Sequence, residues 1–258
     1  MKYELLGSLR VADCTRTSFI SARKIELLLA SLLIRADQIV SIDQLSNEIW
    51  GDAPPRRAMA ALHVHISQLR KFLREVTGGA NPVVTRSPGY VMLLEPGDEM
   101  DVVAFQRFVT LGRGAMRRNQ HEMASESFGT ALGMFRGPVL GNLRGGPIVD
   151  DFVAWADEDR LECIEMKNDV DLTLGRHREL IASLYSLVAE YPLREAFHRQ
   201  LMLALYRAER QGDALMVFHH ARDILDRELG VEPARALRDL YQAILVADDE
   251  LELRTAAA

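Results

Sequence analysis

The sequence predicts a mainly α-helical protein that joins a small mixed part at the N-terminus to a longer all-helical part. Three observations carry this prediction. Short alternating segments occur before residue 97, apolar segments with a helical period recur along the chain, and two stretches of the second part share one pattern of small and aromatic residues. With 258 residues, 48% of them hydrophobic and 26% charged, the chain can form one large or two ordinary globular domains.

The chain begins with a strand pattern followed by two helices. Residues Lys2–Val11 alternate loosely around Gly7, which predicts one or two short strands. A helical period predicts the first helix over Arg23–Ile34. The second helix is predicted to follow Ser41 as its N-cap and to end at Gly51.

A third helix and a hairpin complete the first part. Asp52–Arg57 contains a proline pair that breaks the chain, and Ala58–Val76 then has a helical period. Two short strands, Val83–Arg86 and Tyr90–Leu94, are predicted around the turn sequence SPG. Two helices with a short break between them, placed before a hairpin, have the order of a winged helix-turn-helix. Residues 1–97 are therefore predicted to form such a domain, with a small β-sheet and a wing hairpin.

The second part is predicted to be an all-α, tetratricopeptide-like repeat domain. Glu95–Met100 is the expected boundary, residues 98–250 the helical domain, and residues 251–258 a flexible tail. Small residues where two helices touch, with an aromatic residue between them, are typical of such repeats. The alternative is a generic helical bundle with chance spacing. The two copies of the Ala-x3-Phe-x2-Ala pattern are Ala124, Phe128, Ala131 and Ala214, Phe218, Ala221.

The charge of the two parts differs in sign. Residues 1–97 hold 12 Lys and Arg against 9 Asp and Glu, a net charge of +3, whereas residues 98–258 hold 19 against 28, a net charge of −9. The window Arg56–Arg86 contains six basic residues and one acid, Glu75. Such asymmetry indicates a nucleic-acid-binding module joined to an acidic one, although a solvated basic face is the commoner meaning of a basic patch.

The helix predicted over Ala58–Val76 has two contrasting faces, since successive side chains are about 100° apart. One face is an apolar stripe that predicts a core contact. The opposite face combines small residues and a valine with cations at its rim, so a partner surface can approach it closely. The apolar stripe is Leu62, Ile66, Leu69, Leu73 and Val76, with Phe72 and His65 beside it. The opposite face, termed the outer face, is Arg57, Ala60, Val64, Ser67 and Lys71, with Gln68 and Arg74 at its edges.

The outer face has the chemistry to bind double-stranded DNA. Val64 can touch a thymine methyl group, and Ser67 and Gln68 can bond base edges. Arg86, at the wing, can enter the minor groove, although a solvated hairpin arginine is an equal alternative when it is considered alone. Lys24 of the first helix is expected to lie against a phosphate. The helix cations that can neutralise phosphates are Arg57, Arg70, Lys71 and Arg74.

A metal site on this helix is not expected. His63 and His65 are two positions apart and point roughly 200° away from one another, whereas zinc-binding pairs on helices use spacings of three or four. His65 is expected to pack or to face a phosphate. We therefore expect neither a metal ion nor another cofactor.

Several segments resemble a known family of regulators. HVHISQLRKFL, VVTRSPGYVM and the preceding SIDQLSNEIWG resemble the recognition helix, wing and upstream helix of OmpR/PhoB-type winged-helix domains. ALGMFRGPVLGNL and the long stretch from GRHRELIASL to RALRDLYQAIL resemble the bacterial transcriptional activation domain. Together they resemble the Streptomyces antibiotic regulatory protein family, in its small two-domain form, over Met1 to Leu245.

The resemblance implies a pathway-specific transcriptional activator of an antibiotic or secondary-metabolite gene cluster. Such a protein binds direct repeats in promoter DNA, as a homodimer on DNA, and recruits RNA polymerase holoenzyme. Relatives often carry arginine at the positions of Ala60, Ser67 and Gln68, so a different base preference is implied here. The chain has no receiver domain and no GxxxxGK[ST] loop, so control by phosphorylation or ATP is not expected. The matching DNA-contact positions are Ala60, Val64, Ser67, Gln68, Arg70, Lys71 and Arg86.

Other function classes are less well supported. No GxSxG-like nucleophile motif occurs, so an enzyme is not expected. A helical adaptor that binds a peptide or small molecule stays open, because concave faces of helical arrays often bind ligands. No signal peptide or membrane span is expected, which predicts a cytoplasmic, nucleoid-associated protein. Cys14 and Cys163 have no motif spacing and are expected to be reduced.

Overall fold

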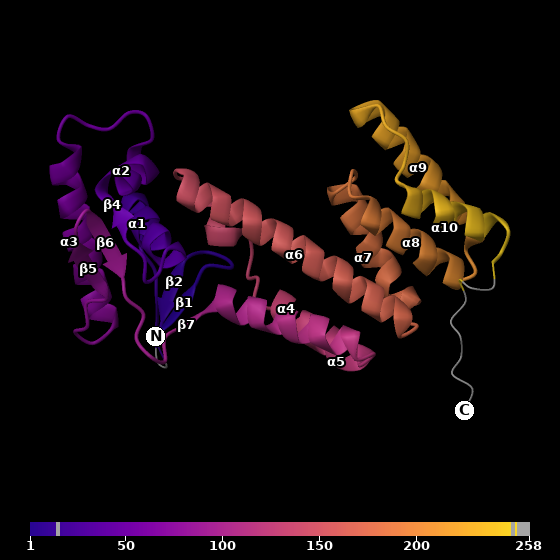
Figure 1. Ribbon diagram of the computed structural model, residues 1–258, viewed down its shortest axis with the longest axis horizontal. Helices are drawn as coiled ribbons and strands as arrows, with labels where there is room; N and C mark the ends of the chain where they lie inside the picture. Colours follow the sequence, from indigo (N-terminus) through magenta and orange to yellow (C-terminus); the bar gives the residue numbers. More distant parts are fainter. Residues whose placement is uncertain (14–15, 249–250, 252–258) are drawn as a thin grey trace. The chain divides into compact units, whose positions relative to one another are not determined.

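A computed structural model describes residues 1–13, 16–248 and 251, and confirms the mainly α architecture (Figure 1). The chain divides into two compact units: Met1–Thr110 with Thr130–Leu161, and Leu111–Gly129 with Glu162–Ala258. The predicted division at residue 97 stays a prediction. Cys14 and the predicted tail, apart from Leu251, lie outside the described residues.

Two small sheets belong to the first unit. Their strand orders are β3-β2-β1-β7 and β4-β6-β5, and β7 joins β1 in parallel with Tyr3 opposite Met100. The two-residue strands β3, β4 and β7 were not predicted. The strands are β1 Lys2–Glu4, β2 Arg10–Ala12, β3 Thr17–Ser18, β4 Val40–Ser41, β5 Val83–Arg86, β6 Gly89–Met92 and β7 Glu99–Met100.

The predicted hairpin is formed by β5 and β6, with a corrected second strand. Instead of Tyr90–Leu94, the strand begins at Gly89, which pairs with Arg86 on one side and Ser41 on the other. It ends at Met92: the Leu93 N–H donates to the Pro82 carbonyl oxygen at 2.9 Å, just before β5, and the Leu94 N–H then donates to the Asp37 carboxylate at 3.3 Å. A Cβ atom at Gly89 would lie 1.9 Å from the Val40 carbonyl oxygen, so only glycine fits where β4 meets β6.

The three helices of the first part have the predicted bounds: α1 Arg23–Ile34, α2 Ile42–Trp50 and α3 Ala58–Val76. The predicted N-cap of α2 is confirmed. The Gln44 N–H donates to Ser41 Oγ at 3.1 Å, and the Ser41 N–H donates to Gln44 Oε1 at 2.9 Å, which completes a capping box. The whole predicted apolar stripe of α3 is buried, and this face of the helix packs against α1 and α2.

Within the first unit, α2 also holds the start of α6 (Pro147–Thr173) through Glu48. The Glu48 residue is only 3% exposed. Its carboxylate accepts the backbone N–H groups of Gly146 at 3.1 Å, Ile148 at 2.8 Å and Val149 at 3.3 Å. An anion at the N-terminus of a helix is stabilised by the helix dipole and by these otherwise unpaired donors.

Beyond residue 100 the described chain is helical, as predicted. The Ala-x3-Phe-x2-Ala residues of both copies are buried. A Cβ atom at Gly112 would lie 2.5 Å from the Phe128 ring, so a small residue meets the aromatic residue of the first copy, as the repeat pattern requires. In the second copy, Phe218 stacks on Tyr241 with ring centroids 4.1 Å apart. Across the described ranges, none of the helices has the length and apolar character needed to cross a bilayer. The remaining elements are α4 Asp101–Arg117, α5 His121–Leu132, the short 3-10 helix η1 Val139–Asn142, α7 His177–Glu190, α8 Glu195–Arg207, α9 Gln211–Leu229 and α10 Arg235–Leu245.

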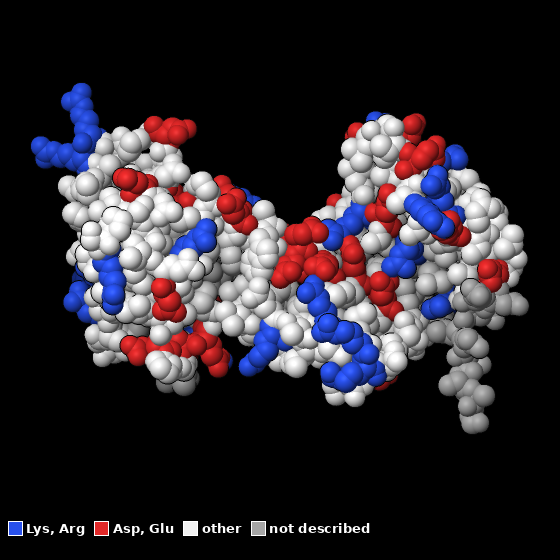
Figure 2. All heavy atoms as spheres, in the orientation of Figure 1, with Lys and Arg blue, Asp and Glu red and all other residues white. Residues whose placement is uncertain are grey.

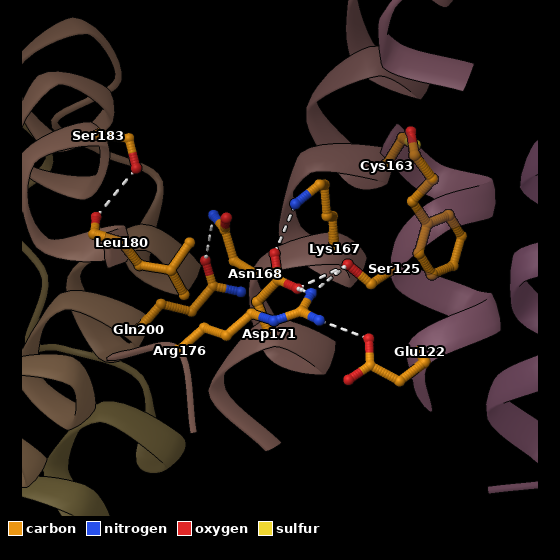
Figure 3. Close-up of polar contacts among 11 residues, drawn as sticks. Glu122, Ser125, Cys163, Lys167, Asn168, Asp171, Arg176, Leu180, Ser183 and Gln200 are labelled. Atoms are coloured by element: carbon orange, nitrogen blue, oxygen red, sulfur yellow. Dashed lines mark hydrogen bonds and ion pairs between the residues drawn. The ribbon is translucent and has the colours of Figure 1, made fainter. Parts of the chain in front are cut away.

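A polar cluster around Asp171 links α5, α6 and the turn before α7 in the second unit (Figure 3). The Asp171 carboxylate accepts from Ser125 Oγ at 2.6 Å, from Arg176 Nη1 at 3.0 Å and from Lys167 Nζ. Burial raises the pKa of Asp171, but the hydrogen bonds from Lys167, Ser125 and Arg176 outweigh it and bring the pKa below its ordinary value. The exposed Glu122 of α5 pairs with Nη2 of Arg176. Because these charges are satisfied by one another, we assign the cluster a structural role.

Candidate nucleic-acid interface

The outer face of α3 is exposed, as its composition predicted. Val64 is 55% exposed although it is apolar, and Ala60 and Ser67 beside it are exposed as well. Lys71 Nζ lies 4.0 Å from Glu75 Oε1, with both side chains largely in solvent, so the pair is weak. The surface therefore offers an apolar group, a hydroxyl and a weakly engaged cation with little bulk around them.

One edge of the outer face carries a row of ring and cation contacts that joins three helices. Lys24 Nζ of α1 lies 5.5 Å from the ring centroid of Trp50, and the His65 ring centroid is 6.1 Å from that of Trp50. His65 Nδ1 is 3.4 Å from Gln68 Oε1, while His63 is exposed. Trp50 thus contacts both Lys24 and the half-buried His65, and His65 in turn lies beside Gln68, the candidate for base reading.

Arg70 lies at the other edge of α3 and is engaged with the hairpin. Its Nε donates to the Val83 carbonyl oxygen at 3.0 Å, and its Nη2 donates to Thr85 Oγ1 at 2.8 Å. The guanidinium carbon is 5.6 Å from the Tyr90 ring centroid. Arg74 Nε in turn donates to the Arg70 carbonyl oxygen at 3.2 Å. The sequence predicted a phosphate contact for Arg70 and gave no sign of these bonds, since their partners lie on a strand 13 to 15 residues away.

Two further predicted contacts lie at the ends of this region. Arg57 is the N-cap residue of α3 and makes no capping hydrogen bond with its side chain, and Arg86 is the last residue of β5; both are exposed. Figure 2 shows Lys and Arg atoms projecting from the loop between α2 and α3. By contrast, α6 carries nine Asp and Glu against two Lys and Arg. All basic residues of the window Arg56–Arg86 except the half-buried Arg70 are therefore exposed.

An apolar groove in the second unit is the other candidate site. It has a volume of about 340 Å³ and lies among α7, α8 and α9, with Tyr185, Leu201 and Met216 among its lining residues. Its carboxylate, from Asp213, is paired with Arg210 Nε at 2.7 Å. The groove gives the adaptor hypothesis a location but no distinctive ligand chemistry.

Comparisons with known proteins match both parts of the chain. Residues 20–92 match the family described as "Transcriptional regulatory protein, C terminal", and residues 100–245 match "Bacterial transcriptional activator domain". Regulatory protein DnrI of Streptomyces peucetius is 34% identical over 98% of this chain and 94% of its own length. Transcriptional regulator RedD of Streptomyces coelicolor is 35% identical over 99% of this chain and 73% of its own length.

A solved structure has the same fold. It is that of Mycobacterium tuberculosis EmbR in complex with a low affinity phosphopeptide, which is 30% identical and superposes with a TM-score of 0.88. The similarity covers 95% of this chain and 65% of the EmbR chain, so the chain spans slightly less than two thirds of that protein.

Proposed function

The chain belongs to the Streptomyces antibiotic regulatory protein family, and from this premise we propose that it is a pathway-specific activator of an antibiotic or secondary-metabolite gene cluster. Its function class is transcription regulation. The finer proposal is that residues 1–97 bind direct repeats in promoter DNA as part of a homodimer. Residues 98–250 then hold the neighbouring protomer and recruit RNA polymerase holoenzyme.

The exposed, small-residue outer face of α3 is the observation that carries this proposal. We place α3 in the major groove, with Val64 against a thymine methyl and Ser67 and Gln68 at base edges. Ala60 leaves room for the close approach, and Arg86 enters the adjacent minor groove. Lys24, Arg57, His65 and Lys71 border the phosphates and supply affinity without sequence choice.

Selection of duplexes from a randomised library by the purified full chain tests DNA binding. We expect enriched sites to contain two direct repeats about one helical turn apart, because adjacent protomers must bind the same side of the duplex. Affinity for the selected duplex should fall steeply with salt. Selection that enriches no sequence would reject the proposal. Binding that salt hardly changes would favour the adaptor hypothesis.

Two variants, Lys71→Ala and Arg117→Ala, separate the loss of a phosphate contact from a general effect of net charge. Lys71→Ala should lower the slope of log affinity against log salt by about 1, because one phosphate contact is lost. Arg117→Ala is the matched control: it removes an exposed cation at the end of α4, outside the proposed interface, and should leave the slope unchanged.

Activation is tested by adding the full chain to RNA polymerase holoenzyme and a promoter that carries the selected site. We expect more transcript with the chain than without it, and no such increase on a promoter whose repeats are scrambled. Equal transcript from both promoters would reject recruitment at the repeats.

A further inference from the structure

We propose that Arg70 is a positioning residue, which fixes the wing against α3 and acts on DNA through Arg86 rather than as a phosphate contact of its own. The inference rests on the proposed function, in which α3 and the wing bind one duplex together. It assigns different roles to two adjacent cations of the same helix, Arg70 and Lys71.

The geometry of the guanidinium carries the inference. Nε and Nη2 donate to two acceptors of the same strand, the Val83 carbonyl oxygen at 3.0 Å and Thr85 Oγ1 at 2.8 Å. A planar group that donates from two nitrogens in fixed directions defines both the distance and the angle of its partner. Arg70 therefore holds β5 in one orientation to α3, which a single flexible ammonium group cannot do.

Arg70 also contacts the second strand of the hairpin. Tyr90 of β6 pairs with Thr85 in the ladder, is 5% exposed, and lies with its ring centroid 5.6 Å from the Arg70 guanidinium carbon. A two-stranded hairpin is marginally stable in water by itself. In this sheet β6 is also paired with β4, whereas β5 is the edge strand, so the contacts of Arg70 bear mainly on β5. Thr85, one of the two acceptors, directly precedes Arg86.

Lys71 provides the contrast within the same helix. Its side chain is 77% exposed, and its partner Glu75 lies 4.0 Å away across one helical turn. Its cation can therefore turn to a phosphate while giving up only this weak pair within the helix. The same movement of Arg70 would break two hydrogen bonds to the hairpin.

Charge-conserving variants of the full chain test the proposal on the duplex selected by the wild-type chain. Arg70→Lys keeps the charge but cannot bridge Val83 and Thr85, so it should weaken binding about as much as Arg70→Ala, roughly tenfold. Lys71→Arg, the matched control, should bind within about twofold of wild type. Restoration of near-wild-type affinity by Arg70→Lys, or unchanged affinity of Arg70→Ala, would overturn the proposal in favour of a charge contact or no role.

A double-mutant cycle tests action through Arg86. Arg86→Ala should weaken binding about tenfold in the wild-type chain but less than about twofold in the Arg70→Ala chain, because the wing is already misplaced there. Losses that multiply would show two independent contacts and would overturn the proposal.

Exposed Thr85 gives a second route that leaves both arginines in place. Thr85→Val removes the acceptor of Nη2, whereas Thr85→Ser keeps it. We expect weaker binding for Thr85→Val than for Thr85→Ser in the wild-type chain, and no difference between them in the Arg70→Ala chain. Equal binding of the two variants in the wild-type chain contradicts the proposal. Failure of the proposed function itself is distinguishable, since the wild-type chain would then select no duplex.

Discussion

Replacing Glu48 with alanine tests whether α2 holds the start of α6. The carboxylate accepts N–H groups from Gly146, Ile148 and Val149, at the residue before α6 and in its first turn. N–H groups at this end of a helix have no acceptor within the helix. The substitution therefore leaves three donors without their protein acceptor and removes an anion from the positive end of the helix dipole.

The expected loss in the free energy of unfolding of the first unit is about 4 kcal/mol. A hydrogen bond to a charged group contributes roughly 1.5–3 kcal/mol, and three are lost. The estimate lies near the lower end of the sum because one of the bonds is long, at 3.3 Å, and water that enters the vacated space can accept from the freed N–H groups. Glu48→Gln keeps one acceptor oxygen, so it should cost about half as much.

Tryptophan fluorescence makes the measurement selective. Trp50 and Trp155 are the two tryptophans of the sequence, and both belong to the first unit. Urea unfolding of the full chain, followed by this signal, therefore reports on that unit. Glu75→Ala is the matched control, since it removes an exposed glutamate of α3 and should change stability by less than about 0.5 kcal/mol. Equal urea midpoints for the Glu48 and Glu75 variants would refute the reasoning.

Three further predictions concern the second unit and the base contacts. Phe128→Ala should destabilise the second unit by about 3–5 kcal/mol, because the ring packs on Gly112; an unchanged urea midpoint by circular dichroism would show that the ring is not core. Gln68→Ala should change base preference at one position of the selected site by about 1–3 kcal/mol, measured by competition between duplexes; unaltered preference removes Gln68 from the readout. Burial lowers the pKa of His198 by more than the hydrogen bond with the Pro192 carbonyl oxygen, at 2.8 Å, raises it, so the unfolded chain takes up a proton at this histidine before the folded chain does. Stability from this group is present above the ordinary pKa of about 6.5 and is lost as pH falls toward the lower folded pKa. The urea midpoint should therefore decline as pH falls below about 6.5, and less so in His198→Gln; equal declines would contradict the assignment.

The sequence predicted elements well where several local signals coincide. The bounds of α2 follow from Ser41 and Gln44, which form a capping box, and from Gly51 at its end. The buried stripe of α3 follows from a period of apolar residues that no other secondary structure satisfies. The exposure of Val64 followed from the same period, so the candidate site was located by its contrast with the core stripe.

Features that depend on distant partners could not be predicted in this way. Glu48 stands among polar residues of an amphipathic helix and has the pattern of a solvated acid. The N–H groups that donate to its carboxylate, however, are about 100 residues away in sequence. The two-residue strand Glu99–Met100 has no periodicity to detect, and it exists because β1 offers a free edge. Arg70 has the spacing of a phosphate contact, and only the folded hairpin supplies Val83 and Thr85.

The chemistry of the outer face explains why α3 is held so firmly. Ser67 and Gln68 are shorter than arginine and compensate less for a misplaced helix, so the proposed recognition by these side chains needs a fixed backbone. Contacts on two edges of α3 hold its backbone in place: Trp50 packs against His65, and Arg70 binds the hairpin. Helix α2 contributes both to the packing of α3 and to the contact with the start of α6, because Trp50 lies two residues after Glu48. On the proposed function, specificity thus depends on the rigidity of the surrounding helices as much as on the contacting side chains.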